Sequence, residues 1–155
     1  MLQEKDEVTR EVRTGVRSAQ SCFVCGPDNP HGMHLAFQTN EGGEMIAEWI
    51  PELEMEGYEG IVHGGIVSTV LDEAMAKAVD ATGAEALTAE LRVRFRKQVC
   101  SGSRVHVRGW IEGRNKRMIN TEAVLSSADG VELAHAWAVF LALKQERSPS
   151  TEEEA

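Results

Sequence analysis

The chain has 155 residues, of which 42% are hydrophobic and 26% charged, a balance that fits one globular domain and excludes wholesale disorder. The formal net charge is -9, so we expect neither nucleic acid nor a membrane as a partner, because both attract clustered positive charge. No apolar run approaches the roughly 20 residues that span a bilayer, and three cysteines without an export signal predict reduced thiols and a cytoplasmic protein.

The two ends of the chain differ in composition from its middle. Residues 1–19 are polar and are predicted to be a frayed lead-in. Residues 146–155 contain Pro149 and three consecutive glutamates, which predicts a disordered acidic tail. No repeat or linker separates these ends, so we expect one domain over residues 20–145.

The domain is predicted to begin with a turn-rich segment and a hairpin. Residues 22–30, CFVCGPDNP, combine glycine with two prolines. Residues 33–39 and 44–50 are apolar segments joined by a glycine turn at residues 41–43, a pattern typical of a β-hairpin. Residues 51–60 are acidic and are predicted to be irregular.

From about residue 64 to residue 79, apolar residues recur with the i, i+3, i+4, i+7 spacing of an amphipathic helix with one broad buried face. This stripe consists of Ile66, Val67, Val70, Leu71, Ala74, Met75, Ala78 and Val79. A second line of small side chains runs beside it and consists of Gly65, Ser68, Asp72 and Ala76. We expect another part of the protein to approach closely there, and we expect Gly83 to end the helix.

After the helix the sequence predicts strands. Residues 91–96 alternate Leu-Arg-Val-Arg-Phe-Arg, and residues 105–111 continue the period of two, interrupted by Gly109. Residues 118–125 and 133–143 form two further strands, the last apolar on both faces as in a central or interface strand. The order predicts an α+β fold in which an antiparallel sheet of about five to six strands packs on one long helix.

The most informative segment is GIVHGG at residues 60–65, directly before the helix. The first turn of a helix presents unpaired N–H groups, and the two glycines leave them open to an oxygen that gains negative charge. Asp72 lies two turns further along and is not expected to face only bulk water. Singly, His63, Asp72 and Thr88 fit ordinary structural roles; their combination indicates a catalytic site.

These motifs resemble a known family. GIVHGG, then TVLDEA, then the strand opening at residues 88–91 (TAEL) are similar to the hotdog-fold thioesterases of the phenylacetate-pathway (PaaI) type, over residues 30–143. The resemblance implies a hotdog fold wrapped around a central helix and hydrolysis of an acyl-CoA thioester to free acid and CoA. It also implies a homodimer or a dimer of dimers (homotetramer), with no cofactor and no metal.

The same resemblance implies roles for five residues. The Gly65 N–H polarises the thioester carbonyl, with Gly64 beside it in the binding loop, and His63 orients the thioester. Asp72 is the general base for water or the nucleophile, and Thr88 holds the water or the carboxylate. In this family the site crosses a dimer interface, so Asp72 and Thr88 would face the helix start of the partner subunit.

Two further features bear on substrate binding. Many relatives carry Asn or Gln six residues before the motif histidine, where this chain has Gly57, and Tyr58 is the candidate to compensate. A predicted hairpin carries Arg114, Lys116 and Arg117, which form either a site for the phosphates of coenzyme A or an ordinary charged turn.

Other interpretations remain open at this stage. Cys22, Cys25, His31 and His34 have the chemistry of zinc ligands, but the histidine spacing is tight, and turn-stabilising cysteines without metal are favoured. The function alternatives are an acyl-thioester hydratase or dehydratase and a non-catalytic acyl-CoA or small-ligand binding module. Asp72 disfavours the binding module, which has no need of a carboxylate near the thioester.

Overall fold

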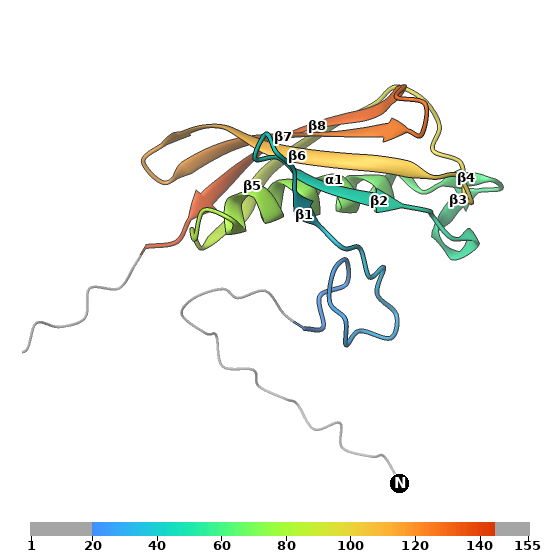
Figure 1. Ribbon diagram of the computed structural model, residues 1–155, viewed down its shortest axis with the longest axis horizontal. Coiled ribbons are helices and arrows are strands. Elements are labelled where there is room, and N and C mark those ends of the chain that lie inside the picture. Colours follow the sequence, from blue (N-terminus) through green and yellow to red (C-terminus); the bar gives the residue numbers. More distant parts are fainter. Residues whose placement is uncertain (1–19, 145–155) are drawn as a thin grey trace, which may run out of the picture.

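The computed structural model describes residues 20–144 (Figure 1). The predicted lead-in at residues 1–19 and the predicted tail at residues 146–155 lie outside this part of the chain. The elements are β1 (Gln38–Thr39), β2 (Met45–Trp49), a 3-10 turn (Leu53–Met55), β3 (Glu56–Tyr58), β4 (Ile61–Val62), α1 (Gly64–Asp80), β5 (Ala86–Phe95), β6 (Val105–Asn115), β7 (Met118–Ser127) and β8 (Glu132–Ala142).

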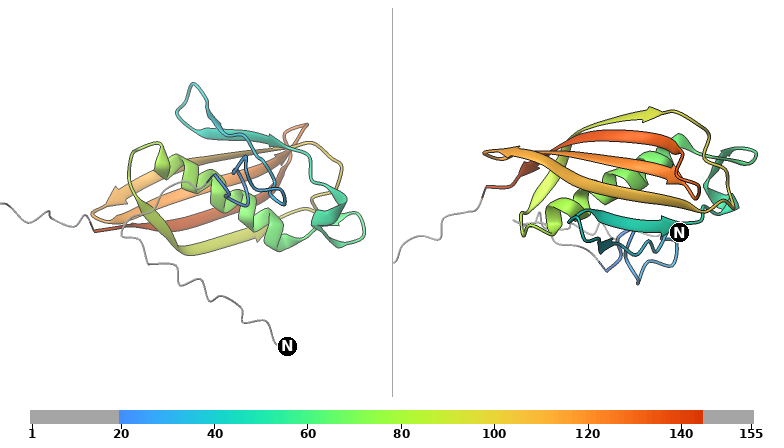
Figure 2. Two further views of the ribbon diagram at one scale, coloured as in Figure 1. Left: turned by 90° about the horizontal axis from the view of Figure 1, so that it is seen from below. Right: turned by 45° about the horizontal axis from the view of Figure 1, so that its top comes forward.

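Six strands form one antiparallel sheet in the order β1-β2-β6-β7-β8-β5. Helix α1 lies across one face of this sheet, which arches over it (Figure 2). β3 and β4 form a separate two-stranded ribbon next to the helix start. The predicted α+β fold, with a six-stranded antiparallel sheet around one long helix, is therefore confirmed.

The predicted helical stripe is the buried face of α1. Seven of its eight residues are buried, and Ile66 is partly buried against the same core. The helix ends at Asp80 with Ala81 as its C-cap, and Gly83 follows with a φ of +81°. Gly83 therefore belongs to the turn after the helix, where a left-handed residue is required.

A row of small residues lets the helix approach the sheet. Gly109 of β6 pairs with Ala123 of β7, which pairs with Ala136 of β8. A Cβ on Gly109 would lie 2.6 Å from the carbonyl carbon and oxygen of Ala74 in α1. Gly109, which interrupts the apolar pattern of its strand, is thus a point of close approach between helix and sheet.

The first hairpin is shorter than predicted. The glycine turn at residues 41–43 is present, but β1 comprises only Gln38–Thr39. His34 has a φ of +53°, which breaks an extended strand. The preceding residues instead bond back to the turn segment, with the N–H of Leu35 donating to the carbonyl of Val24 at 2.9 Å.

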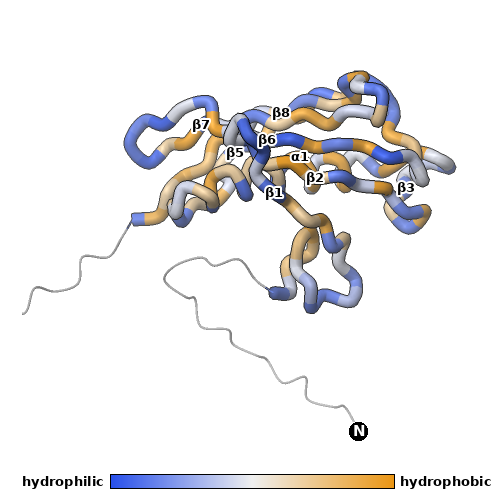
Figure 3. The backbone as a smooth tube through the Cα atoms, in the orientation of Figure 1, coloured by the Kyte–Doolittle hydropathy of each residue, from blue (hydrophilic) through white to orange (hydrophobic). Residues whose placement is uncertain are grey.

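The acidic stretch at residues 51–60 is more ordered than predicted, because it contains the 3-10 turn and β3. The predicted RNKR hairpin is confirmed between β6 and β7, and its hydrophilic tip is visible in Figure 3. Lys116 turns the chain there with a φ of +56°. Within residues 20–144, no helix has the length and apolar character needed to cross a membrane.

Candidate active site

The start of α1 is organised by His63, the N-cap residue. Its imidazole Nδ1 accepts a hydrogen bond from the N–H of Gly65 at 2.9 Å, and its carbonyl accepts from Ile66 and Val67. Because Nδ1 is an acceptor, the proton of the neutral ring lies on Nε2, which becomes a donor. Among residues 20–144 no group accepts from the N–H of Gly64, so the donor left open at the helix start is that of Gly64.

Asp72 and Thr88 are brought together, as the predicted site requires. The Thr88 hydroxyl donates a hydrogen bond to Oδ1 of Asp72 at 2.8 Å, across 16 residues of sequence. Burial raises the pKa of Asp72 above the ordinary value of 3.8; the Thr88 hydrogen bond opposes this and the charge of Glu73 adds to it. The pair is thus a half-buried carboxylate of increased basicity held by a hydroxyl.

A β-bulge aims Thr88 at the helix. In the β5–β8 pairing, Thr88 opposes Phe140 and Glu90 opposes Val139, so Ala89 is an extra residue in β5. Thr88 and Leu91 would lie on opposite faces of a regular strand, because their separation is odd. The bulge lets both face α1, and no sequence pattern had indicated it.

Gly57 lies directly against the motif histidine. A Cβ at this position would come within 3.2 Å of Cα and Cδ2 of His63. The space that a larger residue would need is therefore occupied by the His63 ring. Tyr58, the candidate to compensate, is 81% exposed.

The predicted site residues fall into two groups along α1. Asp72 lies seven residues beyond Gly65, which corresponds to about 10.5 Å of helix rise at 1.5 Å per residue. A reacting carbon must lie about 3 Å from both the attacking oxygen and the oxyanion donors. In one chain the helix start and the Asp72–Thr88 pair are therefore well separated along the helix axis.

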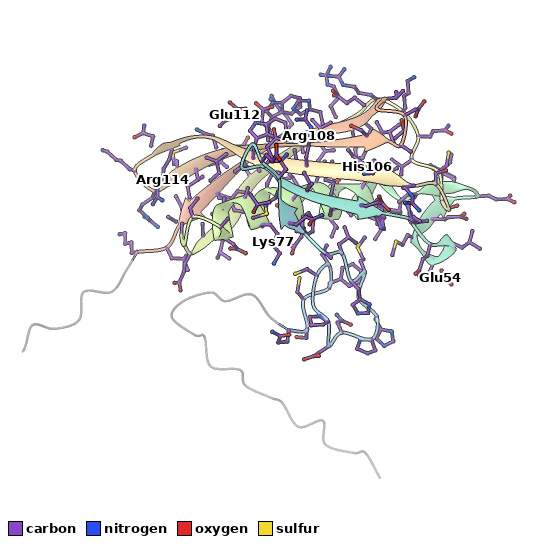
Figure 4. All side chains as sticks on the ribbon, viewed as in Figure 1. Glu54, Lys77, His106, Arg108, Glu112 and Arg114 are labelled. Atoms are coloured by element: carbon purple, nitrogen blue, oxygen red, sulfur yellow. The ribbon has the colours of Figure 1, made fainter. Side chains whose placement is uncertain are left out.

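The candidate phosphate-binding residues lie at the other end of the molecule. Figure 4 places Arg114 at the end of the sheet opposite Glu54, which is next to the start of α1. Nε of Arg114 donates to the carbonyl of Lys116, and Nε of Arg117 to the carbonyl of Ala142. The three basic residues are grouped, but in one chain they are remote from the helix start.

The groups around the two cysteines differ from the possible zinc ligands that the sequence offered, although turn-stabilising cysteines without metal were favoured there. Cys22 and Cys25 lie beside Glu73 of α1, whereas His34 makes a hydrogen bond through Nε2 to the carbonyl of Asn29. Burial, with hydrogen bonds to Glu73 and Cys22, raises the pKa of the Cys25 thiol to about 12. Such a thiol is protonated near neutral pH, which makes it a poor nucleophile for a thioester.

Comparisons with known proteins agree with this architecture. The profile of the thioesterase superfamily matches residues 59–134. The fold is similar to that of a thioesterase superfamily protein with 23% identity and a TM-score of 0.73, over 76% of this chain and 61% of that one. The chain thus spans less than two thirds of that relative.

Two further solved structures are 25% identical to the chain. One is a protein from Bacillus halodurans solved with CoA, with a TM-score of 0.65 over 73% of this chain and 76% of that one. The other is a phenylacetic acid degradation-related protein from Ralstonia eutropha JMP134, with a TM-score of 0.64 over 70% and 85%. No curated protein matches the chain.

The profile match and the fold point to the same class. Residues 59–134 are similar to the thioesterase superfamily, and the chain has the hotdog fold of the solved thioesterases that it resembles. The structures similar to it include the PaaI protein of the phenylacetic acid degradation operon of E. coli.

Proposed function

We propose that this protein hydrolyses an acyl-CoA thioester to the free acid and CoA. The observation that carries the proposal is the Asp72–Thr88 pair, a half-buried carboxylate of raised pKa held at 2.8 Å by a hydroxyl. The CoA bound in the Bacillus halodurans structure supports CoA as the thiol part of the substrate.

In the proposed reaction Asp72 acts as the general base. It takes a proton from water while the water oxygen bonds to the thioester carbonyl carbon. The tetrahedral intermediate then collapses with cleavage of the C–S bond, and the departing CoA thiolate receives the proton from Asp72, which leaves the free acid and CoA. The raised pKa favours this role, because a base is most effective when its pKa approaches the working pH. Thr88 fixes one carboxylate oxygen, so the other is available to the water.

The helix start supplies the oxyanion site. The N–H of Gly64 donates to the carbonyl oxygen as it gains negative charge, and the N–H of Gly65 joins it when the His63 ring turns toward the substrate. The Nε2–H of His63 then orients the thioester. Removing one such donor typically costs a hundredfold or more in rate.

The complete site requires two chains. Because about 10.5 Å of helix separates Gly65 from Asp72, the oxyanion donors of one subunit would serve the Asp72–Thr88 pair of the other. β5 suits such an interface: within residues 20–144 it is a ten-residue edge strand that pairs with β8 alone, and Leu87, Leu91 and Phe95 are 53%, 38% and 52% exposed. Edge strands of this length and composition are rarely left uncovered.

A two-fold edge-to-edge dimer also gives the basic hairpin a role. Antiparallel β5 strands would place the two helices in opposite directions, so the β6–β7 hairpin of one subunit would lie at the same end as the helix start of the other. Arg114, Lys116 and Arg117 would then bind CoA phosphates at the partner's site.

The test is a thiol-release assay over a panel of acyl-CoA esters, comparing the native chain with Asp72→Asn. Hydrolysis of at least one ester that falls a hundredfold or more in the variant supports the proposal. Binding of CoA esters without thiol release would establish the non-catalytic binding module instead. Hydration of an enoyl-CoA without thiol release would establish a hydratase.

A further inference from the structure

The N-terminal turn segment (residues 20–35) contains a tight turn that brings two thiols together. The N–H of Gly26 donates to the carbonyl of Cys22 at 2.9 Å, and that of Asp28 to the carbonyl of Gln20 at 2.9 Å. A Cβ on Gly26 would come within 2.3 Å of the backbone nitrogen of Cys22, so only glycine fits. Cys25 is thereby held on the same side of the turn as Cys22.

The N-terminal turn segment crosses α1 on the face turned away from the sheet (Figure 2). Val24 and Leu35 anchor it in the core, each only 5% exposed. The two thiols therefore lie half-buried between the segment and the helix, in a fixed position rather than on a free loop.

Glu73 completes the cluster from the helix. Its Oε1 lies 3.8 Å from Sγ of Cys22, and the ligand atoms of Glu73, Cys22 and Cys25 are all within 4.8 Å of one another. Nζ of Lys77, one turn along, is 3.8 Å from the same carboxylate oxygen. Figure 4 shows Lys77 on the helix face turned toward the segment.

We infer that Cys22, Cys25 and Glu73 bind a zinc ion, with water as the fourth ligand. Zinc–sulfur bonds of about 2.3 Å and zinc–oxygen bonds of about 2.0–2.2 Å at tetrahedral angles separate neighbouring ligand atoms by roughly 3.5–3.8 Å. The 3.8 Å between Sγ of Cys22 and Oε1 of Glu73 matches that separation. Two sulfur ligands also select zinc over magnesium or calcium.

The charges of the cluster balance when zinc is bound. The ion displaces one proton from each thiol, which leaves two thiolates and one carboxylate around it. The divalent ion and the Lys77 ammonium together offset these three negative charges. The cluster lies on a different side of α1 from the Asp72–Thr88 pair, so the zinc is structural: it fastens the N-terminal turn segment to the helix that carries the base.

This ligand set differs from the one suggested by the sequence. His31 and His34 are outside the cluster, and the ring of His34 is bonded to the carbonyl of Asn29 at 2.6 Å. The two sets therefore make opposite predictions for substitution of the histidines and of Glu73.

The experiment measures zinc in the full-length chain purified under reducing conditions, and after reloading with Zn²⁺ or Co²⁺. We expect roughly one zinc ion per chain, lost in Cys22→Ser and Cys25→Ser and bound at least about tenfold more weakly in Glu73→Gln. The matched controls are Cys100→Ser, which removes an exposed thiol, and the double variant His31→Ala/His34→Ala. Both controls should keep the zinc and the thiolate-to-cobalt absorption band.

The inference is overturned if the native chain contains no zinc and takes up neither metal. It is equally overturned if zinc retention depends on the two histidines, or if Glu73→Gln binds zinc as tightly as the native chain. Circular dichroism of each variant separates loss of the ligand from loss of the fold. Because zinc content is measured without substrate, the result does not depend on whether the chain hydrolyses thioesters.

Discussion

Two neighbouring carboxylates on α1 have very different surroundings. Asp72 accepts a hydrogen bond from Thr88 of β5, and burial raises its pKa. Glu73 faces the N-terminal turn segment, where it lies beside two thiols and the Lys77 ammonium. Successive helix residues point about 100° apart, so one residue of sequence decides which segment each carboxylate meets.

The chemistry of a helical carboxylate is thus set by what packs against its side of the helix. A strand that offers one neutral hydroxyl leaves Asp72 basic and able to accept a proton. A turn that offers sulfur ligands, with a cation nearby, makes Glu73 a candidate metal ligand. Helix α1 thus carries the proposed general base, Asp72, on one side and the proposed zinc ligand, Glu73, on another. Substitutions can test the two roles separately.

The largest effect is expected from Asp72→Asn, which keeps the side-chain volume and removes the base. Thioester hydrolysis should fall a hundredfold or more, measured as thiol release at saturating and limiting substrate. Asp129→Asn, in the exposed turn between β7 and β8, is the matched control and should retain activity. Equal activity in Asp72→Asn and the native chain would show that Asp72 is not the general base.

The next largest effect is expected when the proposed dimer is weakened. Leu91→Asp places a carboxylate on the exposed edge of β5 in both subunits, which should weaken association by roughly 2–3 kcal/mol or more. Sedimentation velocity should show monomers, and hydrolysis should fall with the population of dimers. Ile50→Asp, an equally drastic change at an exposed residue outside β5, should leave both unchanged. A fully active Leu91→Asp monomer would contradict the shared site.

The packing of α1 on the sheet positions both Asp72 and Glu73. The substitution Gly109→Ala tests this packing. The new methyl group would meet the backbone of Ala74 at 2.6 Å, so the free energy of unfolding should fall by about 1–3 kcal/mol. The matched control is Gly113→Ala on the same strand, where an added Cβ meets nothing within 4 Å. Urea denaturation measures both, and equal stabilities would refute the close approach.

The smallest effect is a shift in pH dependence. The proposed reaction requires ionised Asp72, so kcat/KM should fall as the pH drops through a pKa that burial holds above the ordinary value of 3.8. Thr88→Ala removes the hydrogen bond that lowers this pKa, so the acidic limb should move to higher pH with about a tenfold loss of rate or less. Thr88→Ser should restore the native profile. If the acidic limb of the pH profile is unchanged in Thr88→Ala, the Thr88 hydroxyl does not set the pKa of the base.

The sequence predicted those parts of the protein that rest on periodicity. The apolar stripe of α1 and the alternating strands after it both follow from burial against one core, and the helix and long strands are where they were expected. The family resemblance implied that Thr88 holds the water or the carboxylate, and in the structure its hydroxyl donates to Oδ1 of Asp72.

The remainder depends on contacts that no local pattern specifies. The role of His63 Nδ1 as acceptor for the Gly65 N–H is a matter of side-chain rotation at the helix start. The partner of the two cysteines was sought nearby in the sequence, at His31 and His34, whereas the structure supplies Glu73 from a helix some fifty residues away. Its only local signal is the spacing of Glu73 to Lys77, which is common on exposed helices.

The extra residue Ala89 divides β5 into two stretches, and side chains alternate between the two faces of the sheet independently in each stretch. Residues before it set which side chain meets Asp72, and residues after it set which side chains line the exposed edge. Deleting Ala89 would turn Thr88 to the outer face while Leu91 and Phe95 kept their direction. A single-residue insertion or deletion at this point is therefore a route by which such a chain could exchange the side chain that meets Asp72 and still keep the side chains along its exposed edge.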